Sequence, residues 1–154
     1  MFNAVWKVLR LGLWAPLLVL GTHLFLSRVV HAYTSWPPVD MPVHFAGGMA
    51  IAFMVARCFQ HLPREVIRPS RVAMLELLLV LSLTASAAVF WEFAEYTDDK
   101  LFGTNVQVGL NNTMRDMAMG ISGALVVAVV RARQLQLRPG DALQFLREWA
   151  RAPL

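Results

Sequence analysis

The segment from Val72 to Glu92, VAMLELLLVLSLTASAAVFWE, decides the fold class. Between Glu76, near its start, and Glu92, at its end, it carries no charged residue. A helix of about 20 mainly apolar residues crosses the roughly 30 Å hydrocarbon core of a bilayer. The segment is therefore predicted to be a membrane-spanning helix.

Three further apolar runs of similar length lie on either side of this segment, at residues 11–30, 42–59 and 114–130. The chain of 154 residues is 57% hydrophobic and 16% charged, whereas a soluble domain has about half apolar and about a quarter charged residues. The composition predicts an all-α membrane protein with four transmembrane helices, folded as a single integral membrane domain over residues 1–154.

The tail after Pro139-Gly140 has a different pattern. Leu143, Leu146 and Trp149 recur at helical spacing, with arginines able to flank them. An apolar stripe beside basic residues is typical of a helix that lies in the membrane interface. Residues 141–152 are therefore predicted to form a short amphipathic interfacial helix.

The charges predict an orientation. One side of the predicted bundle carries eleven basic and four acidic residues, and the other carries three basic and six acidic residues. The eleven are Lys7, Arg10, Arg57, Arg64, Arg68, Arg71, Arg131, Arg133, Arg138, Arg147 and Arg151, and the four are Glu65, Glu76, Asp141 and Glu148. The positive-inside rule then places both termini in the cytoplasm, in a multi-pass inner (plasma) membrane protein.

The same interpretation excludes other classes. The net charge of +4 sets membrane orientation here, so we expect no nucleic-acid partner. The single cysteine, Cys58, excludes an internal disulfide and a zinc or iron–sulfur site built from cysteines.

The unusual polar residues gather at the non-cytoplasmic end. Asp40 and His44 begin the second helix four residues apart, Glu92 and Glu95 end the third, and Asp116 lies near the start of the fourth. Residues four apart share a helix face. In a compact bundle these helix ends would bring the five side chains to one depth.

Several of these polar residues also have structural interpretations. Asp40, and Asn112 or Thr113, are typical N-caps. Trp91 and Tyr96 suit an aromatic belt at the interface. The run from Asp98 to Lys100 is most simply a solvated loop.

Glu92 and Glu95 fit a structural role less well. A helix dipole disfavours anions at a C-terminal end, and two carboxylates three residues apart repel each other. Ionisable groups this close to hydrocarbon usually have a partner or face a water-filled cavity. Arg115, Arg28, His44 or a bound cation are the candidate partners.

His44 suits metal ligation, proton transfer or a hydrogen bond to a carboxylate. Oxygen-rich sites with one imidazole suit hard or borderline divalent cations, so His44, Glu92, Glu95 and Asp116 are the candidate metal ligands. His31 is expected at a similar level. His23, in the middle of the first span, could hydrogen-bond within the bundle or ligate haem with another histidine.

Three motifs in a fixed order carry a family resemblance: Asp40-Met-Pro-Val-His44-Phe45, then Trp91-Glu92-Phe-Ala-Glu95, then Asn112-Thr113-Met-Arg-Asp116. The stretch from about residue 40 to 130 resembles the YjdF/VanZ-like small integral membrane proteins. In those families the residue before the threonine is usually acidic, where this chain has Asn112. The resemblance implies a role connected with lipids or the cell envelope.

Two classes of function remain open. In the first, the chain is a metal-assisted enzyme acting on a lipid or envelope intermediate. His44 would be base or ligand, Glu92, Glu95 and Asp116 would be ligands or acid–base groups, and Asp40 would orient them. In the second, the chain is a non-catalytic subunit or scaffold that binds a protein partner, a further copy of itself or a structural cation. A carrier or proton-coupled channel is disfavoured, because Glu76 alone makes a poor relay.

Overall fold

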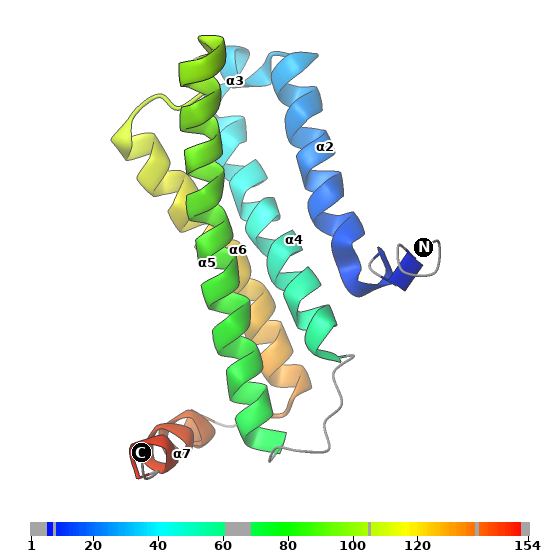
Figure 1. The fold of residues 1–154 in the computed structure, drawn as a ribbon, viewed down its shortest axis with the longest axis vertical. Helices are drawn as coiled ribbons and strands as arrows, with labels where there is room; N and C mark the ends of the chain where they lie inside the picture. The colour runs from blue at the N-terminus through cyan, green and yellow to red at the C-terminus, as the bar shows by residue number, and fades with distance from the viewer. Residues whose placement is uncertain (1–5, 8, 61–68, 105, 138, 152–154) are drawn as a thin grey trace.

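The computed structural model describes residues 6–7, 9–60, 69–104, 106–137 and 139–151. All regular secondary structure in these residues is helical (Figure 1). In chain order the elements are η1 (Leu9–Leu13), α2 (Trp14–Arg28), α3 (Ala32–Ser35), η2 (Pro37–Val39), α4 (Asp40–Gln60), α5 (Pro69–Phe102), α6 (Leu110–Gln134) and α7 (Pro139–Ala150).

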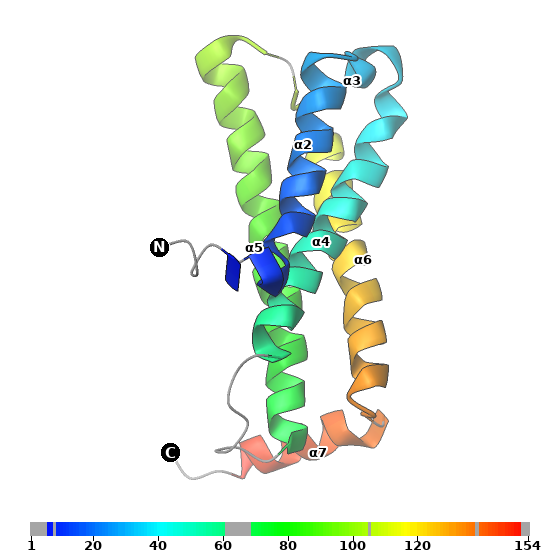
Figure 2. The same ribbon diagram turned by 90° about the vertical axis from the view of Figure 1, so that its right-hand side faces the viewer.

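The predicted fold class is confirmed. Four segments are long and apolar enough to cross a membrane: Arg10–Arg28, Pro37–Gln60, Val72–Phe102 and Leu110–Gln134. The short helix α7 follows them and runs across one end of the bundle (Figure 2). Leu143 and Leu146 of α7 are exposed, which agrees with the predicted amphipathic pattern.

The third helix is longer than predicted, and this changes where the acidic residues lie. α5 continues ten residues beyond Glu92, so Glu92 and Glu95 are inside a helix and not at its C-terminus, where the apolar length predicted them. The prediction of a loop from Asp98 to Lys100 is also wrong. The helix ends where Gly103 adopts a φ of +65° and its N–H bonds the Asp99 carbonyl, as a C-terminal glycine does.

Helices α4 and α6 pack unusually closely because two glycines face the opposite backbone. A Cβ atom at Gly48 would overlap the Gly120 carbonyl, and one at Gly123 would overlap the Phe45 carbonyl. Small residues in membrane helices allow this kind of backbone approach. The contact fixes the register between His44 on α4 and Asp116 on α6.

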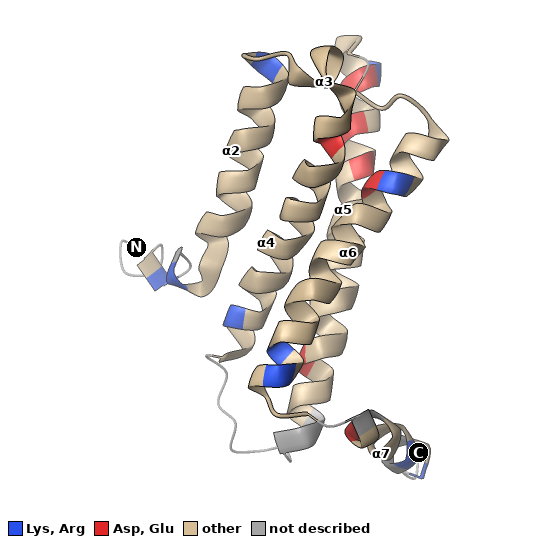
Figure 3. Ribbon diagram, turned by 180° about the vertical axis from the view of Figure 1, so that it is seen from behind, with Lys and Arg blue, Asp and Glu red and all other residues tan. Residues whose placement is uncertain are grey.

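Charged residues separate along the bundle axis. Figure 3 shows most basic segments toward the α7 end and most acidic segments at the opposite end. Arg64, Glu65, Arg68 and Arg138, which enter the predicted asymmetry, lie outside the described residues. Near the α7 end, Arg131 of α6 makes a buried ion pair with Glu76 of α5, a pairing that the sequence analysis did not foresee.

Candidate functional site

Five side chains from three helices meet at the end of the bundle opposite α7. α4 contributes Asp40 and His44, α5 contributes Glu92 and Glu95, and α6 contributes Asp116. We call these five residues the carboxylate cluster. They are the five that the sequence analysis singled out.

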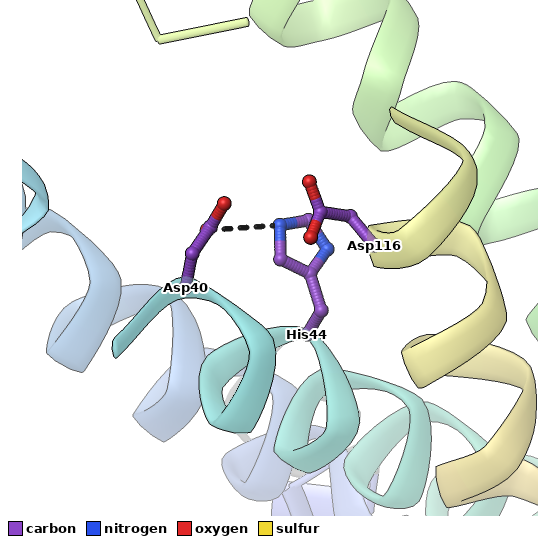
Figure 4. Close-up of side chains that lie close together, drawn as sticks. All are labelled: Asp40, His44 and Asp116. Atoms are coloured by element: carbon purple, nitrogen blue, oxygen red, sulfur yellow. Dashed lines mark ion pairs between the residues drawn. The ribbon is translucent and has the colours of Figure 1, made fainter. Parts of the chain in front are cut away.

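His44 lies at the centre of the cluster. Its Nε2 atom is 3.2 Å from Asp40 Oδ1 and 3.8 Å from Glu95 Oε1. Figure 4 shows Asp40 and Asp116 on either side of the imidazole. Asp40 is the first residue of α4 and has helical torsions (φ −58°, ψ −51°), so the N-cap interpretation is wrong and its carboxylate faces the cluster.

Two overlapping sets of ligand atoms share His44. Asp40, His44 and Asp116 form one set, and His44, Glu92 and Glu95 form the other; within each set the ligand atoms lie within 4.8 Å of one another. Oxygen ligands with one imidazole match a hard or borderline divalent cation. The donor set therefore fits a metal ion.

Asn112 connects two of the carboxylates. Its amide nitrogen donates to Asp40 Oδ2 at 3.3 Å and to Asp116 Oδ2. The N-cap interpretation of Asn112 is wrong, because α6 begins at Leu110 after Gly109, whose φ is +136°. The Gly109 carbonyl accepts from the N–H groups of Asn112 and Thr113, which turns Asn112 inward.

Trp91 belongs to the site. Its indole N–H donates to Glu95 Oε1 at 2.7 Å. The spacing of four residues between Trp91 and Glu95 places both side chains on one helix face, and this spacing could have predicted the contact. Tyr96, by contrast, is exposed, and the Lys100 ammonium lies 5.3 Å from its ring centroid.

Glu92 is the least satisfied member of the cluster. The residue is 4% exposed, and neither carboxylate oxygen has a hydrogen-bond partner. Thr113 and Gln107 lie beside it but do not reach hydrogen-bond geometry. His44 Nε2 is also buried without a hydrogen bond. Burying an ionised group without a partner is costly.

The arginines expected near these carboxylates have other contacts. Arg28 pairs with Asp98 at 3.4 Å, and Arg115 is exposed with a guanidinium nitrogen 3.3 Å from Met41 Sδ. Among the described residues, no Lys or Arg side chain makes an ion pair with the cluster. Four carboxylates thus share one imidazole.

Asp98 and Asp99 shape the rim of the site. Asp99 accepts from Thr104 Oγ1 and from the N–H groups of Val106 and Gln107. Asp98 accepts from Thr104 and from Arg28. These bonds fold the segment after α5 back over the helix end and bring Gln107 beside Glu92.

Two further histidines, His23 and His31, lie elsewhere, and His61 lies outside the described residues. His23 is buried, its Nδ1 is 2.7 Å from the Tyr33 hydroxyl, and its ring meets Trp91 edge-on. Burial raises the pKa of the Tyr33 hydroxyl, so Tyr33 stays protonated at neutral pH. His31 is exposed with a φ of +52°, and its carbonyl accepts from Thr34 and Ser35. It is outside the cluster.

Comparisons with known proteins agree with the class of the fold. A family model described as a predicted membrane protein (DUF2238) matches residues 5–136. No curated protein and no solved structure matches the chain. The matched range includes α2, α4, α5 and α6 and every residue of the carboxylate cluster. The chain belongs to the DUF2238 family of predicted membrane proteins.

Proposed function

We propose that the chain is a small multi-pass inner-membrane protein whose carboxylate cluster binds a divalent metal ion. The metal assists hydrolysis or group transfer on a lipid or cell-envelope intermediate. The resemblance to YjdF/VanZ-like proteins, carried by the motifs around His44, Glu92 and Asp116, supports an envelope role.

One observation carries the proposal. Glu92 is buried with both oxygens unpartnered, next to Glu95 and to His44, whose buried Nε2 lies 3.2 Å from Asp40 Oδ1 without forming a hydrogen bond. A group of buried carboxylates with no Lys or Arg ion pair among the described residues needs positive charge from elsewhere. A divalent cation supplies that charge and uses the unpartnered atoms as ligands.

The residues of the cluster have different roles in this proposal. Glu92, Glu95 and His44 are the metal ligands, and Asp116 is a further ligand or an acid–base group. Asp40 holds the imidazole from one side, at 3.2 Å. A bound divalent metal would lower the pKa of a coordinated water and polarise a substrate oxygen. Because the site is at one membrane face, its substrate would be an amphiphile of that leaflet.

The proposed topology has both termini in the cytoplasm and the cluster at the opposite face. The charge asymmetry supports it. Reporter fusions after Gly103 and after Leu137 should therefore report opposite sides of the membrane. Reports from the same side would contradict this arrangement.

Metal analysis of the purified protein in lipid nanodiscs tests the proposal. Wild type should carry a stoichiometric divalent metal, and Glu92→Gln, Glu95→Gln and His44→Ala should each lose it. Asp98→Asn is the matched control, because Asp98 is on the same helix but pairs with Arg28 outside the cluster. A wild type without metal affinity, or a Glu92→Gln variant with unchanged affinity, would overturn the proposal.

A non-catalytic subunit is the second candidate, in which the cation is structural. The exposed face of α7, with Leu143 and Leu146, favours it as a surface for a protein partner or a further copy of the chain. Phenotype separates the two candidates. A structural cation predicts that activity in cells follows the amount of folded protein in the Glu95→Gln and Asp116→Asn variants. An enzyme predicts loss of activity at normal protein levels.

A further inference from the structure

An apolar cavity adjoins the carboxylate cluster on the side of the membrane centre. It has a volume of about 220 Å³ and lies between α2, α4 and α5. Its lining runs from Pro16 to His23 on α2, from Val43 to Ile51 on α4 and from Thr84 to Trp91 on α5. Two turns of each helix correspond to a length of about 10 Å. We call this cavity the α2–α5 groove.

The groove begins at the cluster, since His44 belongs to both. Its other lining residues descend along the helices toward the middle of the spans. A molecule that lies in the groove would therefore have one end beside His44 and the rest in the apolar interior.

The groove opens sideways. α2 packs along α4, and near the cluster it meets α5 through the edge-on contact of His23 with Trp91. Leu17 and Leu20 of α2 line the groove and are also exposed. Since α2 and α5 are membrane-spanning segments, this opening faces the hydrocarbon of a bilayer.

Three polar side chains that line the groove already form hydrogen bonds. Thr84 Oγ1 donates to the Val80 carbonyl, His23 bonds Tyr33, and Trp91 donates to Glu95. Apart from His44 and the Nε2 atom of His23, the described lining thus provides no further hydrogen-bonding side chain for a polar occupant. Its chemistry fits a hydrocarbon.

We propose that the α2–α5 groove holds one hydrocarbon chain of a lipid substrate, whose polar head then reaches His44 and the carboxylate cluster. This inference rests on the proposed function, because it names the class of substrate for the same site. The size agrees with a segment of one chain, since a dry apolar cavity of about 150 Å³ already holds benzene. A second chain of the lipid would remain in the bilayer.

Photolabelling tests the occupant. The full chain is placed in nanodiscs of phosphatidylethanolamine and phosphatidylglycerol that contain a trace of a phospholipid with a diazirine on one acyl chain. Labelled peptides are mapped by mass spectrometry. We expect label on the lining residues of α2 and α5, such as Leu17 and Ala87, above the level on Val126 and Val129, which are exposed on α6.

Variants that fill the groove make the test specific. Ala87→Phe and Gly47→Leu should both lose the label from the groove. A Cβ at Gly47 meets only Val19 Cγ1, at 3.8 Å, so the second variant is sterically mild. Val89→Phe is the matched control on α5, because Val89 is exposed and does not line the groove; it should keep the label.

The outcomes are separable from those of the proposed function. The inference is overturned if the groove is labelled no more strongly than α6. It is also overturned if neither Ala87→Phe nor Gly47→Leu reduces the label. The inference is also overturned if the groove carries no label and the wild type is a dimer that Ala87→Phe dissociates. In that case a second copy of the chain covers the groove. Glu92→Gln should keep the label while losing metal. A wild type with label but no metal affinity would overturn the proposed function and leave a chain-binding groove.

Discussion

Two buried polar sites join α5 to other helices, and they differ in charge balance. Near the α7 end, Glu76 receives two guanidinium contacts from Arg131, and Arg131 also donates to Gln134 at 3.2 Å. At the opposite end, four carboxylates share the single imidazole of His44. Both sites are buried between helices that could cross a membrane.

The difference in charge balance indicates that the two buried sites have different roles. A buried charge is stable when an opposite charge and hydrogen bonds compensate it. The Glu76–Arg131 pair provides this compensation within the chain, so it acts as a link between α5 and α6. The carboxylate cluster does not, because Glu92 has no hydrogen-bond partner and Arg28 and Arg115 have contacts elsewhere. The buried negative charge of the cluster must therefore be compensated by a cation or by protons from outside the chain.

Breaking the balanced pair should have the largest effect on stability. Glu76→Leu or Arg131→Met alone leaves one buried charge without a partner and should cost about 3–5 kcal/mol of the free energy of unfolding. The double variant Glu76→Leu/Arg131→Met should recover most of that loss, because two apolar side chains replace a complete pair. Denaturant titration in detergent measures all three variants.

The effect of added divalent metal on stability shows whether the Glu76–Arg131 pair and the carboxylate cluster are independent. Each stable variant of the Glu76–Arg131 pair should gain as much stability from metal as wild type does, about 2.7 kcal/mol at a concentration a hundred times the Kd. A loss of the metal effect in these variants would show that the two sites are not independent.

Removing the neutral donor of the cluster should have an intermediate effect. Asn112→Ala deletes the donor that holds Asp40 and Asp116 together. Hydrogen bonds to charged groups are worth about 1.5–3 kcal/mol, so metal-free Asn112→Ala should lose about that much stability. Asn111→Ala, at the exposed neighbouring position, should lose little.

The metal dependence of this loss sharpens the comparison. A bound cation that has Asp116 as a ligand would hold this carboxylate in place of the amide. The destabilisation of Asn112→Ala, measured by the same titration, should therefore shrink when divalent metal is added. An equal loss with and without metal would contradict Asp116 as a ligand of the cation.

The sequence predicts the membrane fold because long apolar runs have few alternatives. It also predicts that Asp40, His44, Glu92, Glu95 and Asp116 lie at one end, since that requires only that helices of one membrane length lie side by side. The apolar length alone ended α5 too early, because the charged run from Asp98 to Lys100 looks like a loop. Gly103 was the available stop signal.

The individual side-chain pairs between helices could not be predicted from the sequence. The pairing of Glu76 with Arg131 joins residues 55 positions apart, and it depends on the rotation and register of α5 against α6. The same holds for the α2–α5 groove, which exists because α2 packs along α4. Trp91 was assigned to the lipid interface because tryptophan near a helix end is typical there.

The contact between His23 and Tyr33 lies beside the cluster and should have the smallest effect. Tyr33→Phe removes a neutral hydrogen bond of 2.7 Å, so we expect a loss of about 0.5–1.5 kcal/mol and unchanged metal affinity. A change in metal affinity would place His23 and Tyr33 within the metal site.

The pH dependence of the same variant has a defined sign. Burial raises the pKa of Tyr33 above its ordinary value of 10.0, so the folded chain keeps a proton that the unfolded chain releases. The contribution of Tyr33 is thus fully present below pH 10.0 and is lost as the pH rises toward the folded-state pKa. Unfolding curves at neutral pH and above pH 10.0 should show a steeper loss in wild type than in Tyr33→Phe. Equal slopes would mean that Tyr33 is as accessible in the folded as in the unfolded chain.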